Sequence, residues 1–293
     1  MNDIVHVDRA RTRAELEKKL PPKTRRFQLD EIPGVMRSRL GWPVAAALMD
    51  RWFRGAGFAI SLPIKISKSP NKLHQLPTSQ LEENVVTMGW ALGFSRVRAA
   101  VSQLQARWNS PAGRVELKKR VEQQTRGQIR PWRFGDLNQP AKILDDTCQV
   151  NFLSVGRPSD PMDDFYGAMG EATLKVAVSG LVTPEGHGKA AVAIDELAFY
   201  LRDSYDFNDD SFLSQPLGFW GPRGVQRIPR SAMDIPLDEQ WMYADAADAS
   251  RQSYLVQNRH FRQWRALHGR GGDFMVVSDV HRVRLPFPIK LEW

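Results

Sequence analysis

The sequence predicts an α+β protein in which a basic helical N-terminal part precedes a mainly antiparallel β domain, barrel-like in form, with a few short helices. Between positions 41 and 126, apolar residues recur at three- and four-residue spacing, as in amphipathic helices. After position 170, apolar and polar residues alternate, as in half-buried strands. With 293 residues, 42% of them hydrophobic, the chain is long enough to bury a sizeable core.

Three segments follow from these patterns. Residues 1–40 form a charged N-terminal arm, in which Pro21–Pro22 prevents a continuous helix. Residues 41–126 form a basic helical unit suited to docking or loading. Residues 127–293 form an α+β domain that we expect to carry catalysis.

The helical unit begins with a helix whose first turn contains Pro43 and which stops at Gly55. Residues 60–78 are expected to be loop, with one short strand. Ser79 followed by Glu82 fits a capping box and predicts the start of the next helix. A further helix runs from Pro111 to about residue 126.

The second half is loop-rich to residue 170 and then becomes strand-like. Two strands, 172–183 and 189–202, are expected to form a hairpin, the second with a bend near Asp195–Glu196. A strand at 253–257 precedes a short helix at 259–268 that Asn258 caps and Gly269 closes. Two closing strands are expected at 273–280 and 281–291.

Charge is distributed unevenly along the chain. The formal net charge is +8, but residues 1–126 have a net charge of +12 and residues 127–293 a net charge of −4. A protein that coats DNA would spread basic surface over its working domain, so nucleic acid is not the favoured partner. The basic half is either a solvated face or a docking surface for anionic lipid or an acidic protein.

The remaining composition excludes several classes of protein. The single cysteine, Cys148, excludes a framework of intramolecular disulfides. No apolar run is long enough for a conventional membrane-spanning helix. The first residues carry no apolar signal core, so we expect the protein to be made in the cytoplasm without a signal peptide.

Strong catalytic motifs are absent from the sequence, including a Walker loop, GxGxxG after a strand, HExxH, GxSxG and paired CxxC. The glycine-rich stretch 269–273 leads into a strand rather than a helix, so it is expected to be a tight turn rather than a phosphate cradle.

The segment LRDSYDFNDD, residues 201–210, is the main candidate site. Asp203 and Tyr205 project to one face of an extended strand, and Asp206 falls on the adjoining turn. Such carboxylates either bind a divalent cation such as Mg²⁺ or act as acid and base, with the Tyr205 hydroxyl as an orienting group. The alternative is that the segment is only a turn, with Tyr205 and Phe207 packed inward.

The hairpin followed by Asp203, Tyr205 and Asp206 resembles the catalytic region of the colicin M family over roughly residues 170–210. Those bacteriocins cut the pyrophosphate linkage of lipid II, the peptidoglycan precursor, in the periplasm. The resemblance implies that these three residues are catalytic. The family's following His–Arg pair is replaced here by Phe212–Leu213, and His260 is the candidate for a base supplied from elsewhere.

A wider resemblance covers the second half, including YLRDSYDFNDDSFLSQPLGFWG and YLVQNRHFRQWRALHGRGGDFMVVSDV. These stretches are similar to an uncharacterised bacterial family that often occurs near type VI secretion components. The resemblance implies an antibacterial effector, a toxin delivered to the periplasm of a target cell. Its expected partners are a lipid-linked pyrophosphate at a membrane surface, a secretion spike or chaperone, and an immunity protein.

Two other functions stay open on the sequence. The chain is either a non-enzymatic secretion adaptor or cargo module, or a metal-dependent nuclease toxin in which the acidic cluster binds the ion. Large aromatic residues such as Trp220 and Trp241 are either core or an apolar patch for a lipid tail or a partner.

Overall fold

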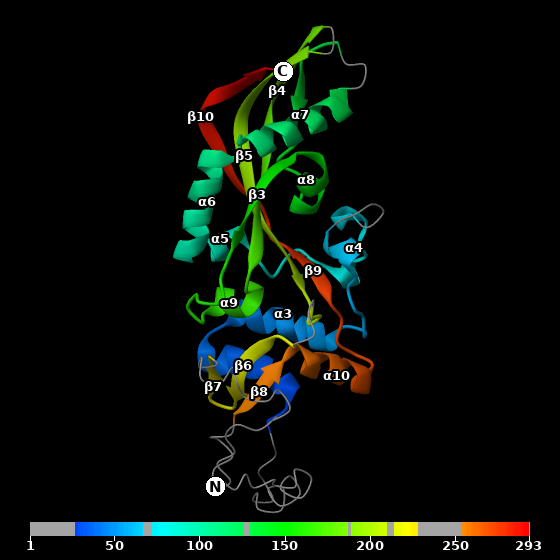
Figure 1. The fold of residues 1–293 in the computed structure, drawn as a ribbon, viewed down its shortest axis with the longest axis vertical. Coiled ribbons are helices and arrows are strands. Elements are labelled where there is room, and N and C mark those ends of the chain that lie inside the picture. The colour runs from blue at the N-terminus through cyan, green and yellow to red at the C-terminus, as the bar shows by residue number, and fades with distance from the viewer. Residues whose placement is uncertain are drawn as a thin grey trace, which may run out of the picture.

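The computed structural model describes residues 27–66, 72–125, 129–186, 189–209, 214–227 and 253–292. It confirms the predicted α+β class, with a sheet that curls into a half-barrel and short helices around it (Figure 1). The first elements are short helical turns followed by one longer helix: η1 (Leu29–Glu31), α2 (Ile32–Val35), η2 (Met36–Leu40) and α3 (Pro43–Arg54).

The remaining elements of the first half, in chain order, are α4 (Leu62–Lys65), η3 (Leu73–Gln75), η4 (Thr78–Gln80), β1 (Leu81–Glu82), α5 (Met88–Ala91), α6 (Ser95–Arg107) and α7 (Pro111–Thr125). Those of the second half are β2 (Trp132–Phe134), α8 (Ala141–Thr147), β3 (Gln149–Val155), α9 (Asp164–Met169), β4 (Ala172–Gly186), β5 (Lys189–Tyr205), β6 (Pro216–Gly221), β7 (Gly224–Gln226), β8 (Tyr254–Gln257), α10 (Asn258–His268), β9 (Phe274–Val277) and β10 (His281–Glu292).

The long antiparallel hairpin of β4 and β5 runs along the molecule and forms the centre of a seven-stranded sheet. On one side, β2 and β3 pair with successive parts of β4. On the other side, β10 pairs with the first part of β5 and β9 with its end. Pairing with β4 stops at Arg202, so the end of β5, which contains the candidate site, is held among the described strands by β9 alone.

A β-bulge interrupts β5 at the predicted bend. Ser179 of β4 pairs with Glu196, but the next residue, Gly180, pairs with Ile194, so Asp195 is an extra residue in the strand. A β-carbon on Gly180 would lie 2.2 Å from the carbonyl oxygen of Ala193, so the close approach at the bulge requires glycine.

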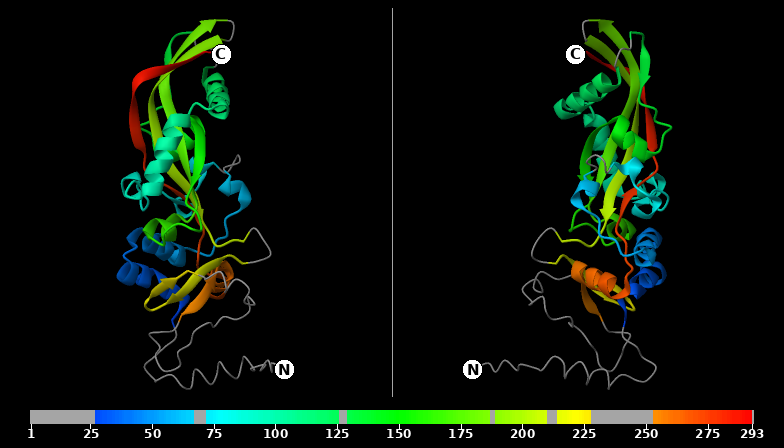
Figure 2. Two further views of the ribbon diagram at one scale, coloured as in Figure 1. Left: turned by 60° about the vertical axis from the view of Figure 1, so that its left-hand side comes forward. Right: turned by 90° about the vertical axis from the view of Figure 1, so that its right-hand side faces the viewer.

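Helices α6 and α7 pack against β3, and α8 lies inside the curve of the sheet (Figure 2). At the other end of the molecule, α3 packs against α9, and a separate three-stranded sheet of β7, β6 and β8 lies beside α10. Buried side chains from these helices and both sheets form one hydrophobic cluster.

Two local predictions were wrong. No helix begins at Ser79, because the Glu82 side chain is buried against Arg51, 2.6 Å away, rather than available for a capping box. Leu81–Glu82 instead forms a short parallel strand beside β9, and the helix α5 begins later, with Thr87 as its N-cap. Residues 62–65, expected to be in loop or strand, form the one-turn helix α4.

The boundaries of the other predicted elements agree closely with the structure. Helix α3 begins at Pro43 and ends before Gly55, and α7 covers Pro111–Thr125. Helix α10 ends at Gly269, whose φ of 63° is left-handed, although its N-cap is Gln257 rather than Asn258. The sequence predicted β8 as a strand at 253–257 but did not predict β2, β3, β6 or β7, which lie in segments rich in proline and turn residues. The arm was predicted as residues 1–40, and residues 1–26 of it lie outside the described residues.

Candidate functional site

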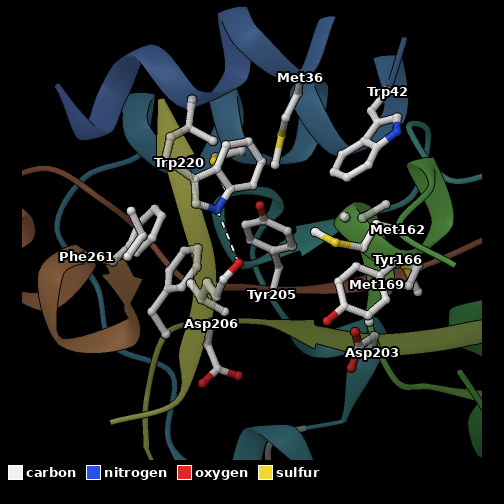
Figure 3. Close-up of a pocket in the computed structure, with 18 of the residues that line it drawn as sticks. Met36, Trp42, Met162, Tyr166, Met169, Asp203, Tyr205, Asp206, Trp220 and Phe261 are labelled. Atoms are coloured by element: carbon white, nitrogen blue, oxygen red, sulfur yellow. Dashed lines mark hydrogen bonds between the residues drawn. The ribbon is translucent and has the colours of Figure 1, made fainter. Parts of the chain in front are cut away.

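A pocket of about 170 Å³ lies where the end of β5 meets α3, α9 and the small sheet (Figure 3). Asp203, Tyr205 and Asp206 all contribute to its wall, so the structure brings the three predicted residues to one pocket. The rest of the lining is mostly apolar and rich in methionine and aromatic residues: Ile32, Met36, Trp42, Met49, Met162, Tyr166, Ala168, Met169, Phe207, Leu217, Trp220, Val256 and Phe261.

The strand β5 explains how these side chains are arranged. Asp203 and Tyr205 alternate along β5 and belong to one face of it, as the two-residue period predicts, and Phe207 follows just beyond the strand. Pairing with β9, Asp203 with Val276 and Tyr205 with Phe274, fixes the strand in this register. The predicted geometry of Asp203 and Tyr205 therefore holds.

Asp203 is a carboxyl group with few polar neighbours. Among the described residues, its one hydrogen-bond partner is the Ser204 N–H, which donates to Oδ1 at 2.8 Å. Burial raises the pKa of Asp203 well above its usual range, and the negative charge of Asp206 acts in the same direction. Lys65 and Arg202 oppose the change in pKa only in part. Asp203 is therefore a carboxyl that holds its proton at a higher pH than an exposed aspartate.

Tyr205 is held by aromatic packing. Its ring stacks on Phe274 with centroids 5.2 Å apart and meets Phe207 edge-on at 5.7 Å. Its hydroxyl points into the pocket between Met36 and Trp220 (Figure 3). Burial raises the pKa of Tyr205 above its usual value, so the hydroxyl stays protonated and is available as a donor.

Asp206 has a different environment. Lys65 Nζ lies 2.8 Å from Asp206 Oδ1, and the Asn208 N–H donates to the same oxygen at 3.1 Å. Figure 3 shows the Asp206 carboxylate pointing away from the Tyr205 hydroxyl and apart from Asp203. Asp203 and Asp206 thus line the same pocket, but the Asp206 carboxylate is paired with Lys65 and the Asp203 carboxyl accepts only from the Ser204 N–H among the described residues.

The contacts of Asp206 bear on the expected Mg²⁺ ion. Asp206 Oδ1 already accepts from the Lys65 ammonium, a cation of the protein itself, which leaves Oδ2 as the oxygen that could ligate a metal ion. Within the described part of the chain, no group of three histidine, cysteine, aspartate or glutamate side chains is placed to hold a metal ion. The Mg²⁺ ion stays a prediction.

The structure does not bring His260 to the pocket. His260 is absent from the pocket lining, although the next residue, Phe261, is part of it. Its Nδ1 accepts the Gln257 N–H at 3.1 Å at the start of α10, and its Nε2 is buried. Burial and the neighbouring Arg259 lower its pKa to about 4. The observed contact is that of a neutral helix-capping group, not of a base facing Asp203.

The acidic residue Asp209 and the glycine-rich stretch 269–273 make structural contacts away from the pocket lining. Asp209 pairs with Arg262, with 2.6 Å between carboxylate and guanidinium, and accepts from the side-chain amide of Asn258. In the stretch 269–273, Gly271 packs so closely on Trp52 that a β-carbon would lie 2.6 Å from the indole, which agrees with a tight turn. Asp210, His187, Phe212–Leu213 and Trp241 lie outside the described residues.

Sequence reasoning singled out Trp220, as either core or an apolar patch, but missed most of the pocket wall. Trp220 lines it and forms an edge-on pair with Trp42 at 6.4 Å. Tyr166 of α9 also lines it, toward the end where Asp203 lies (Figure 3). These side chains come from distant segments, and only the abundance of methionine and tryptophan among the turn residues signalled them in the sequence.

A family model described as "Family of unknown function (DUF6402)" matches residues 27–293. No similar curated protein and no similar solved structure was found. None of the described helices combines the length and apolar character needed to cross a membrane. Because the match extends over most of the sequence, the chain belongs to the DUF6402 family of unknown function.

Proposed function

We propose that the pocket is the active site of a hydrolase that cleaves a pyrophosphate linkage attached to an apolar chain. The substrate class follows from the resemblance of the segment containing Asp203, Tyr205 and Asp206 to the colicin M family, which implies lipid II. The observation that supports it most is the contrast between the two carboxyl groups. Asp203 has an apolar setting that favours its protonated form, whereas Asp206 is paired with Lys65.

Because Asp203 favours its protonated form, Asp203 is the group that donates and accepts protons in the proposed reaction. Water attacks the phosphorus atom, the bond from phosphorus to the leaving oxygen breaks, and Asp203 donates its proton to that oxygen. The attacking water then loses a proton to the Asp203 carboxylate, which restores the starting state. Tyr205 donates a hydrogen bond that orients the substrate, and the apolar wall receives the hydrocarbon part.

The biological setting completes the proposal. The protein acts as an antibacterial toxin, delivered by type VI secretion to the periplasm of a target cell, where it removes a precursor of peptidoglycan. The basic first half contacts anionic headgroups or a secretion partner, and an immunity protein protects the producing cell. Support for this setting comes from the sequence resemblance and the charge asymmetry.

The test is hydrolysis of purified lipid II by wild-type protein and by Asp203→Asn, in buffers with Mg²⁺ and with a chelator. Asp203→Asn is expected to lose at least about 100-fold in rate, because general acid catalysis contributes on that order or more. Tyr205→Phe should lose less. The matched control is Asp195→Asn, which removes an exposed carboxylate of the same strand paired with Arg133.

Expression experiments test the setting. Export of the wild-type protein to the periplasm should lyse cells, and expression in the cytoplasm should not. Full activity or full toxicity of Asp203→Asn would contradict the assignment of this site. Toxicity confined to the cytoplasm, with cleavage of DNA, would instead indicate the nuclease.

The apolar wall also favours a second candidate, a non-enzymatic adaptor. A pocket lined by several methionine and tryptophan side chains is suited to an apolar side chain of a partner protein. An adaptor predicts no harm in either compartment. It also predicts that Trp220→Ala weakens partner binding while Asp203→Asn leaves it unchanged.

A further inference from the structure

The helix α4 carries Lys65, the cation that contacts Asp206 of the candidate site. The Lys65 ammonium lies 2.8 Å from Asp206 Oδ1, and the Lys65 carbonyl accepts from the Arg202 guanidinium at 2.5 Å. The Asp206 side chain is only 6% exposed and that of Lys65 21% exposed. A carboxylate so well shielded from water needs a compensating charge, and Lys65 supplies it.

We propose that Lys65 is a positioning residue of the site: it anchors and neutralises Asp206, so that Asp203 is left as the single carboxyl that exchanges protons with the substrate. This role deepens the proposed function and rests on it. No sequence pattern pointed to Lys65, which is 141 positions from Asp206.

The groups around Asp203 show why the role matters. The Ser204 N–H of β5 favours the ionised form of Asp203, Asp206 just beyond the strand disfavours it, and the charges of Lys65 and Arg202 favour it. The facing strand β9, residues Phe274–Val277, has no charged side chain, and α9 contributes the side chain of Tyr166. Among the charged groups, Lys65 offsets the effect of Asp206 on Asp203 more than Arg202 does.

Loss of the Lys65 charge has two physical consequences. The Asp206 charge would act on Asp203 without compensation and would raise the pKa of Asp203 further. Asp206 would also become a second proton acceptor beside Asp203, so the two groups would titrate together. The second consequence removes the difference between the two carboxyl groups on which the proposed chemistry depends, and the first hinders Asp203 from releasing its proton.

The test is a pH titration of the Asp203 side-chain carboxyl in the full chain, followed by carbon NMR with labelled aspartate and assigned by comparison with Asp203→Asn. Lys65→Met should raise the pKa of Asp203 by about one unit or more. Lys65→Arg keeps the charge and should leave the titration close to that of the wild type. The double variant Lys65→Met/Asp206→Asn removes both charges and should reverse most of the increase.

The single variant Asp206→Asn gives an independent arm if Lys65→Met fails to fold. It removes the negative charge and keeps the ammonium, so the pKa of Asp203 should fall. An unchanged Asp203 titration in Lys65→Met and in Asp206→Asn would overturn the proposal, as would a double variant that titrates like Lys65→Met. Because the titration uses no substrate, a protein that titrates as expected but cleaves no lipid II would refute the proposed function alone.

Discussion

Asp203, Tyr205 and Asp206 are neighbours in sequence, yet each has a separate environment. The shared face of Asp203 and Tyr205 could be predicted, because the two-residue period of a strand is a local property. The partner of Asp206 could not be predicted, since Lys65 comes from a distant segment that was expected to be loop or strand. His260 was predicted as a base only to replace the His–Arg pair of the colicin M family, whereas its contacts depend on where α10 begins.

His260 makes a pH-dependent contribution to stability. Its pKa in the folded protein is about 4, below the usual value of 6.5 in an unfolded chain. The unfolded chain therefore binds the extra proton between these values, and the contribution is lost as the pH falls from 6.5 toward 4. His260→Asn should remove this loss, on the order of 2 kcal/mol given that the ring is partly exposed.

Urea denaturation at pH 7 and pH 4.5 measures the effect. The change in unfolding free energy between the two pH values should be smaller in His260→Asn than in the wild type. His268→Asn is the matched control, because it removes an exposed histidine from the same helix. Equal acid losses in wild type and His260→Asn would contradict the buried, neutral state of this ring.

At the scale of elements, the local signals predicted boundaries well and tertiary pairing poorly. Pro43 and Gly55 set the ends of α3, which is a property of the residues themselves. The strand β1 has only two residues and exists because Leu81 and Glu82 meet β9, which no local pattern encodes. The N-terminus of α3 is also completed from a distance, because Trp42 at the N-cap offers no side-chain hydrogen bond.

Asp164 of α9 completes that helix. Its carboxylate accepts the Ala45 N–H at 2.9 Å and the Val44 N–H at 3.2 Å, together with the Trp90 indole N–H at 3.0 Å. Asp164→Ala should cost about 2–4 kcal/mol of unfolding free energy, since it leaves these donors without an acceptor.

Chemical denaturation compares Asp164→Ala with Asp50→Ala, which removes a partly exposed carboxylate of α3 paired with Arg37. Asp50→Ala should cost under about 1 kcal/mol. A similar small loss in both variants would show that α3 does not depend on the cap from α9.

At the scale of the whole molecule, one buried carboxylate joins four segments around the end of β5. Asp273 accepts the Trp52 indole N–H at 2.8 Å, the Ile60 N–H at 3.1 Å and the Asn208 amide at 3.1 Å, and it pairs with Arg265. These donors come from α3, the segment before α4, the turn after β5 and α10. The α+β class was predictable from periodicity, but this junction was not, because its members are dispersed along the chain.

Asp273→Ala should destabilise the protein by about 3–5 kcal/mol, because it leaves the Arg265 guanidinium without its carboxylate in the interior. Hydrogen exchange should show earlier opening of amides in α3, α10 and the end of β5 together. The double variant Asp273→Leu/Arg265→Leu removes both charges and should recover part of the loss. Faster exchange confined to α10 would contradict a joint role.

The extra residue at Asp195 has a consequence for the whole strand. Before it, the buried Val192 and Ile194 alternate with more exposed neighbours, whereas beyond it every side chain from Leu197 to Leu201 is buried. Because side chains alternate along a strand, the inserted residue reverses which positions, odd or even, face a given side of the sheet. If Asp195 were deleted and the pairing of residues 196–205 kept, the side chains of Val192 and Ile194 would turn to the opposite side of the sheet. If the pairing of residues 189–194 were kept instead, Asp203 and Tyr205 would turn away from the pocket. The one inserted residue therefore lets Val192 and Ile194 be buried at one end of β5 while Asp203 and Tyr205 line the pocket at the other end.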